Sequence, residues 1–62
     1  MNKCYDKNNA LLCIGDAVMY VDTQNGRENE GLITDLLPNN QIILNGESGS
    51  ITVDASDCFY LP

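Results

Sequence analysis

Turn-forming residues divide this chain of 62 residues into short pieces. Gly and Asn, in places with Pro, gather at 15–16, 25–26, 38–40 and 45–49. No window between them repeats apolar residues at every third or fourth position over the length that a helix needs. The sequence therefore predicts an all-β protein made of short strands and turns.

The segments between the turns are rich in β-branched and aromatic residues, which favour strands. The predicted strands are 17–21, 30–37, 41–44, 51–53 and 58–61, and 54–57 is predicted as a tight helical turn. Residues 1–10 are polar and aperiodic, so we interpret them as an arm or a loose edge strand. Because open edges of so small a sheet would pair with neighbouring molecules, we expect a small closed barrel or a strongly bent sheet.

Three stretches of the sequence resemble a class of small barrels. Residues 15–21 read Gly-Asp-Ala-Val-Met-Tyr-Val and are similar to the Gly-Asp-x-Val-x-Val opening strand of KOW-like and Tudor-like barrels. Residues 30–34 resemble the second strand of these barrels, and residues 56–61 resemble their closing turn and strand. The chain is similar in the same way to short hypothetical proteins of bacteria and their phages.

This resemblance implies a five-stranded SH3-like barrel with a short 3-10 turn before the last strand. The domain would cover residues 11–62, after a polar N-terminal arm of residues 1–10. Barrels of this class serve RNA binding, peptide binding and assembly alike, so the resemblance does not choose among these functions.

The charge balance excludes several partners. Nine acidic residues against Lys3, Lys7 and Arg27 give a net charge of −6. A nucleic-acid-binding surface uses roughly one Lys or Arg for each phosphate contact. We therefore expect no direct binding to nucleic acid and none to an anionic membrane surface. The acidic charge suits a partner protein with a basic surface, or it serves only solubility.

The cysteines predict a compartment and exclude a zinc site. Cys4, Cys13 and Cys58 are odd in number and unclustered, and residues 1–9 lack a hydrophobic signal region, so we expect a reducing cytoplasm. A structural zinc site needs four Cys or His ligands, and the chain has three Cys and no His. The acidic loop after residue 21 also fails the calcium-loop spacing. We expect neither a metal nor a cofactor.

The sequence also predicts that the protein is not an enzyme. Without His there is no ordinary base to activate a cysteine. Asp57 beside Cys58 should raise the pKa of that thiol, and we interpret Cys58 as a core residue. Asp54 and Asp57 are interpreted as turn residues, because a chain of this size leaves little room for a substrate pocket.

Strand alternation places Val18 and Tyr20 on one face of their strand and Ala17, Met19 and Val21 on the other, and the resemblance to small barrels implies that Val18 and Tyr20 point inward. The predicted core is Val18, Tyr20, Ile33, Leu36, Ile42, Leu44, Ile51, Val53 and Cys58. The apolar residues expected to point outward are Met19, Val21, Leu32 and Ile43, with Arg27, Glu28 and Glu30 beside them. Either Leu11 and Leu12 fold over this surface and complete the core, or it is open to a homodimer or another protein.

Two functions remain open from the sequence. The first is a non-catalytic protein-interaction or assembly module that uses these outward residues. The second is an inhibitor of a nucleic-acid enzyme, a regulatory or anti-defence protein of phage type, whose carboxylates take the place of phosphates. The carboxylates concerned are those of Asp22, Glu28, Glu30, Asp35, Glu47, Asp54 and Asp57. Binding through carboxylates should weaken strongly with salt, whereas an apolar contact should hardly respond.

Overall fold

The computed structural model describes residues 2–47 and 49–62, and this part of the chain is all-β, as predicted. The elements are β1 (Cys4–Tyr5), β2 (Leu11–Leu12), β3 (Ala17–Val21), β4 (Glu28–Leu37), η1 (Pro38–Asn40), β5 (Gln41–Gly46), β6 (Gly49–Asp54), η2 (Ala55–Asp57) and β7 (Phe59–Tyr60). The predicted strands correspond to β3–β7, and the predicted helical turn is the 3-10 turn η2. The longest strand, β4, begins two residues earlier than its predicted start at residue 30.

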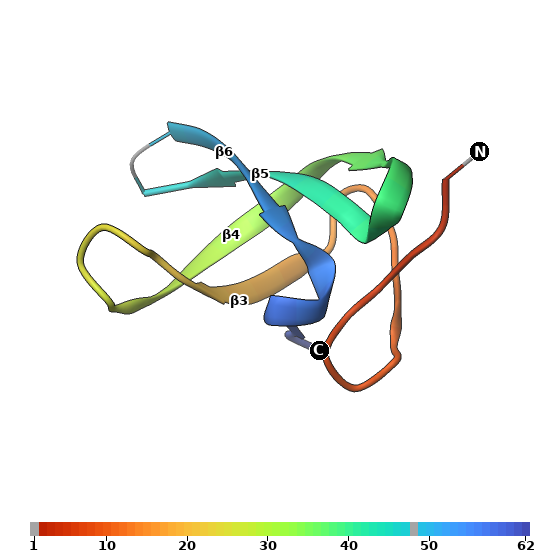
Figure 1. Cartoon of the computed structure of the whole chain (residues 1–62), viewed down its shortest axis with the longest axis horizontal. Coiled ribbons are helices and arrows are strands. Elements are labelled where there is room, and N and C mark those ends of the chain that lie inside the picture. Colours follow the sequence, from red (N-terminus) through yellow and green to blue (C-terminus); the bar gives the residue numbers. More distant parts are fainter. Residues whose placement is uncertain (1, 48) are drawn as a thin grey trace.

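The strands form one antiparallel sheet in the order β6-β5-β4-β3-β7, and β1 and β2 form a separate pair. Each strand from β3 to β5 pairs with the next strand in the sequence, and the last strand, β7, pairs with the other side of β3. The register of β4 against β5 shifts between Ile33 and Asp35, which is the mark of a β-bulge and bends the strand. Figure 1 shows the resulting twist, with the β5–β6 hairpin crossing β4.

The expected closure into a hydrogen-bonded barrel is wrong for the described residues. β6 and β7 are the two edges of the sheet and do not pair with each other. The strand β7 is only two residues long, and the N-terminal segment occupies positions beside it. There the backbone N–H of Lys7 donates to the carbonyl of Cys58 at 2.9 Å. The other expectation, a strongly bent sheet, fits this open arrangement.

The buried face of the sheet is the one that alternation, together with the resemblance to small barrels, predicts. Val18, Tyr20, Ile33, Ile42, Leu44 and Cys58 are buried, and Leu36, Ile51 and Val53 are partly buried against them. Cys4, Leu12 and Ala55 complete this core. The N-terminal segment and η2 therefore contribute to the same core as the five-stranded sheet.

The ring of Tyr20 lies against two glycines of the sheet. A Cβ atom added at Gly31 would lie 3.2 Å from the Cε1 atom of Tyr20. At Gly46 the added Cβ would collide with the phenol oxygen and lie 3.0 Å from Cζ. Real Cβ atoms essentially never approach that closely, so glycine at 46 makes room for the buried Tyr20 ring.

Replacing Gly46 by Ala should therefore lower the free energy of unfolding by about 1–3 kcal/mol through overpacking. Urea unfolding measures this change. Adding Tyr20→Phe removes the colliding oxygen, so the double variant should recover part of the loss. Gly26→Asn is the control, because Gly26 has a φ of 69° that Asn tolerates and open space around it. An unchanged unfolding midpoint for Gly46→Ala would contradict this packing.

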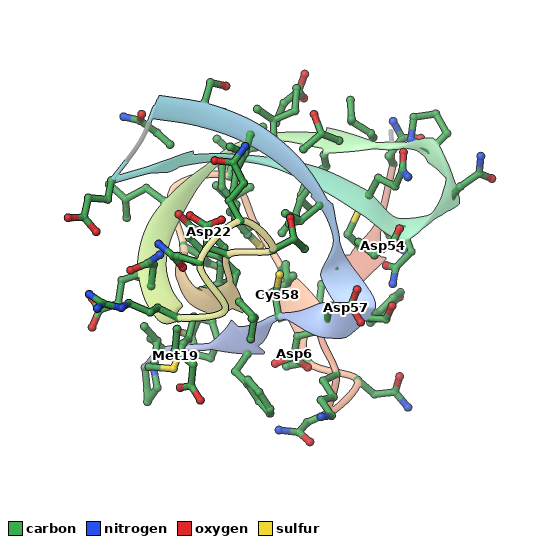
Figure 2. The ribbon with its side chains drawn as sticks, turned by 60° about the vertical axis from the view of Figure 1, so that its left-hand side comes forward. Asp6, Met19, Asp22, Asp54, Asp57 and Cys58 are labelled. Atoms are coloured by element: carbon green, nitrogen blue, oxygen red, sulfur yellow. The ribbon has the colours of Figure 1, made fainter. Side chains whose placement is uncertain are left out.

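The Asp6 carboxylate links the N-terminal segment to the sheet through hydrogen bonds. Its side chain is buried; Oδ1 accepts the backbone N–H groups of Asn8 and Ala10 at 2.8 Å each. Oδ2 accepts the backbone N–H of Tyr60 in β7 at 2.9 Å. Burial would raise the pKa of Asp6, but the hydrogen bonds from Tyr60, Ala10 and Asn8 outweigh it and lower the pKa. Figure 2 shows Asp6 at this end of the molecule, near Cys58.

Candidate interaction surface

The outer face of the sheet carries most of the residues predicted for partner contact. Met19 in β3 lies opposite Glu30 of β4 and opposite Phe59 of β7. Val21 lies opposite Glu28 in the same strand pair. Directly opposite residues of an antiparallel pair project from the same face. Figure 2 agrees, since Met19 points away from the space that the curved ribbon encloses and Cys58 lies inside it.

Apolar side chains on this face are open to solvent. Val21 is 51 % exposed, Leu32 is 53 % exposed and Phe59 is 39 % exposed, while Met19 is half-buried. These four residues on three adjacent strands are called the outer-face patch below. Phe59 was not among the predicted contact residues, because only the pairing of β7 with β3 brings it beside Met19.

Charges of both signs border the outer-face patch. Glu28 and Glu30 are exposed on β4 and flank Val21 and Met19 across the strand pair. At the β7 side, the Lys7 ammonium lies 5.1 Å from the centre of the Phe59 ring, a cation–π contact. The patch therefore has carboxylates next to Leu32 along β4 and an ammonium group at β7.

The two remaining predicted residues lie near this patch without being part of it. Ile43 is half-buried in β5 and lies opposite Asp35 and Thr52, beyond β4 from Met19. Arg27 is exposed in the loop between β3 and β4, where its carbonyl accepts the N–H of Asp22 at 2.8 Å. Its own N–H donates to the Asn25 side chain at 2.9 Å, which fixes the loop backbone.

The paired residues Leu11 and Leu12 have different roles. Leu12 is 1 % exposed and belongs to the core, but the two leucines do not together cover the outward apolar surface, as one of the two expectations required. Leu11 is 52 % exposed and lies elsewhere, in a hollow of about 500 Å³ that it shares with Lys3, Ile14 and Leu36. The N-terminal segment thus completes the core and still leaves Val21 and Leu32 of the outer-face patch exposed.

The carboxylates considered for phosphate mimicry lie in several parts of the fold. Glu28 and Glu30 are on the outer face of β4, and Asp35 follows the bulge of that strand. Asp54 ends β6, and Asp57 lies in η2. Glu47 lies in the turn after β5, and Asp22 directly follows β3.

The environment of Cys58 favours its protonated thiol. Burial, and then the charges of Asp57, Asp54 and Asp6, raise the pKa of Cys58 to about 11. The Cys58 thiol donates to the carbonyl of Asp54 at 3.5 Å, and the buried Cys4 thiol donates to the carbonyl of Gln41 at 3.3 Å. Cys13 is exposed. No group of three or more metal-ligating side chains occurs within 2–47 and 49–62.

In the described part of the chain, no helix has the length and apolar character needed to cross a membrane. No protein-family model, curated protein or solved structure matches this chain.

Proposed function

We propose that this chain is a non-catalytic interaction or assembly module of the cytoplasm that binds a partner protein through the outer-face patch. The observation that carries the proposal is the exposure of Val21, Leu32 and Phe59 on adjacent strands of one face. Contiguous exposed apolar surface on a small domain is typical of a protein-binding site.

The strand order supports an SH3-like arrangement as the scaffold of this module. Four strands from β3 to β6 pair in sequence, and the 3-10 turn η2 leads into a short strand that returns to β3. This is the order of elements that the sequence resemblance implies. The raised pKa of Cys58 favours a structural thiol over a nucleophilic one.

The borders of the patch indicate the kind of partner. A matching surface would offer an apolar centre and, opposite Glu28 and Glu30, basic side chains. The apolar centre provides binding that persists in salt, and the carboxylates orient the partner and increase the association rate. Because each copy carries a net charge of −6, two copies of this chain repel each other, so a different, basic partner fits better than a homodimer.

The test is affinity capture from a lysate of the native host with the intact protein and two matched variants. Leu32→Asp introduces a charge into the outer-face patch, and Leu11→Asp introduces the same charge at an equally exposed residue elsewhere. We expect Leu32→Asp to lose a partner that the intact protein and Leu11→Asp retain at high salt. The free energy of unfolding of each variant, measured in urea, should lie within about 0.5 kcal/mol of that of the intact protein.

Two outcomes would contradict the proposal. Equal capture by Leu32→Asp and the intact protein would remove the outer-face patch as the binding site. Capture of a nucleic-acid enzyme that high salt abolishes would favour the inhibitor that presents carboxylates in place of phosphates.

A further inference from the structure

The two edges of the five-stranded sheet differ in how they are covered. The N-terminal segment covers the β7 edge. There the N–H of Tyr60 donates to the Asp6 carboxylate, and the carbonyl of Cys58, the residue before β7, accepts the N–H of Lys7. At β6, the described part of the chain provides no such cover along Thr52. An uncovered edge strand presents unpaired backbone N–H and C=O groups, to which another strand can be added.

The hydrogen-bonding direction of β6 follows from the neighbouring strands. The N–H of Ile33 donates to the carbonyl of Asp16, and the carbonyl of Ile33 accepts the N–H of Gly15, so Ile33 bonds away from β5. Its opposite residue Leu44 must then bond toward β6, where it faces Ile51. Since the direction alternates along a strand, the backbone N–H and C=O of Thr52 point to the open edge.

A hollow of about 430 Å³ lies along this edge of the sheet. Ile51, Thr52 and Val53 of β6 line one side. The end of β3 and the loop after it line the other, with Tyr20, Val21, Asp22, Thr23 and Gln24. Ile51 and Val53 pack against the core but remain partly exposed here, because no strand follows β6 in the sheet.

The charges around this hollow select the added strand. Asp22 lines it, and Asp54 ends β6, whereas no lysine or arginine is among the lining residues. One oxygen of Asp22 accepts the N–H of Gln24 at 2.8 Å, and no donor within residues 2–47 and 49–62 hydrogen-bonds the second oxygen. Figure 2 shows Asp22 and Asp54 on different sides of the structure, so the two charges would meet different parts of an extended segment.

We propose that the β6 edge binds an extended segment of a partner protein, in which apolar residues alternate with lysine or arginine. The backbone of the segment pairs with Thr52, its apolar side chains cover Ile51 and Val53, and its basic side chains face Asp22 and Asp54. This site is separate from the outer-face patch except at Val21, and it does not depend on the function proposed for that patch.

Thr52→Pro tests the backbone pairing. Proline at this position removes the N–H that points to the open edge and leaves the Leu44–Ile51 pairing intact, as edge strands tolerate. Thr52→Val is the matched control, because it changes the side chain and keeps the N–H. The probe is a synthetic peptide in which valine and lysine alternate, titrated into the ¹⁵N-labelled protein and followed by NMR.

We expect the peptide to shift the amide signals of β6 and to protect the Thr52 amide from hydrogen exchange in the intact protein and in Thr52→Val. Thr52→Pro should weaken binding at least tenfold while its other amide signals stay in place. If Thr52→Pro does not fold, hydrogen exchange of the Thr52 amide in the intact protein alone tests the backbone pairing: the peptide should slow this exchange. Asp22→Asn should weaken binding severalfold and reduce its salt dependence, whereas Glu28→Gln, on the outer face, should not.

Several results would overturn this inference. One is that the amide signals of β6 do not shift at millimolar peptide. Another is that a peptide in which glutamate replaces lysine binds as tightly as the valine–lysine peptide. A third is a dimer of the intact protein, seen by sedimentation, that Thr52→Pro dissociates, since the occupant would then be a second copy. Leu32→Asp should retain peptide binding, so failure of the outer-face patch and failure of this edge are distinguishable.

Discussion

Replacing Asp6 by Ala should cause the largest loss of stability of any single carboxylate substitution in this protein. The buried Asp6 side chain accepts three backbone N–H groups, two in its own loop and one in β7. Hydrogen bonds to a charged group contribute about 1.5–3 kcal/mol each, and unpaired buried N–H groups add a further cost. We expect a loss of about 3 kcal/mol or more, enough to unfold much of a domain this small.

Urea unfolding at neutral pH measures this effect, with two comparisons. Asp6→Asn keeps an acceptor for Asn8 and Ala10 but places its amide group against the N–H of Tyr60, so an intermediate loss is expected. Glu30→Gln is the control, because it removes a carboxylate from an exposed position on β4. Similar unfolding curves for Asp6→Ala and Glu30→Gln would contradict the anchoring role of Asp6.

The lowered pKa of Asp6 also predicts the direction of the pH dependence. Because the folded state favours the carboxylate, its contribution to stability is present above the unfolded value of about 3.9. That contribution is lost as the pH falls below this value and through the lowered pKa of the folded state. The intact protein should therefore lose more stability on acidification than Asp6→Asn does, which urea midpoints measured at several pH values would show.

The second large effect is expected at the paired leucines of β2. Leu12→Ala removes a side chain that is 1 % exposed and should cost about 2–5 kcal/mol through lost burial and a residual cavity. Leu11→Ala truncates a neighbour that is 52 % exposed and should change stability by about 0.5 kcal/mol or less. Equal unfolding midpoints for the two variants would show that the N-terminal segment is not part of the core.

The contrast between these leucines shows where the sequence was informative and where it was not. Alternation over five or more residues predicted β3 and placed Val18 and Tyr20 on one face, and the resemblance to small barrels implied that this face is buried. The strands β1 and β2 have two residues each, too few for alternation to indicate which side chain is buried. Cys4 was therefore missed as a core residue, and the sequence did not distinguish the buried Leu12 from the exposed Leu11.

Asp6 was missed for a different physical reason. A carboxylate in a core contradicts the ordinary separation of polar and apolar residues, and it is stable there only because backbone N–H groups surround it. One of these donors, the N–H of Tyr60, lies 54 residues away in the sequence. A local signal existed in the Asp-x-Asn spacing of Asp6 and Asn8, which is typical of an Asx turn, but it does not reveal the contact with β7.

The candidate interaction surface was likewise predicted only in part. Alternation separated Met19 and Val21 from Val18 and Tyr20, and the resemblance to small barrels implied that Met19, Val21 and Leu32 point outward. The addition of Phe59 depends on the pairing of β7 with β3, a contact between distant parts of the chain. The open edge at β6 was also not predicted, because the resemblance to small barrels implied a closed sheet.

The most direct test of the outer-face patch is a methyl NMR titration of the protein with the partner that it captures. Signals of Met19, Val21 and Leu32 should shift or broaden on binding, whereas those of Leu11 and Ile14, exposed elsewhere, should remain unchanged. Changes confined to Leu11 and Ile14, with Met19, Val21 and Leu32 unaffected, would show that the partner binds a different surface.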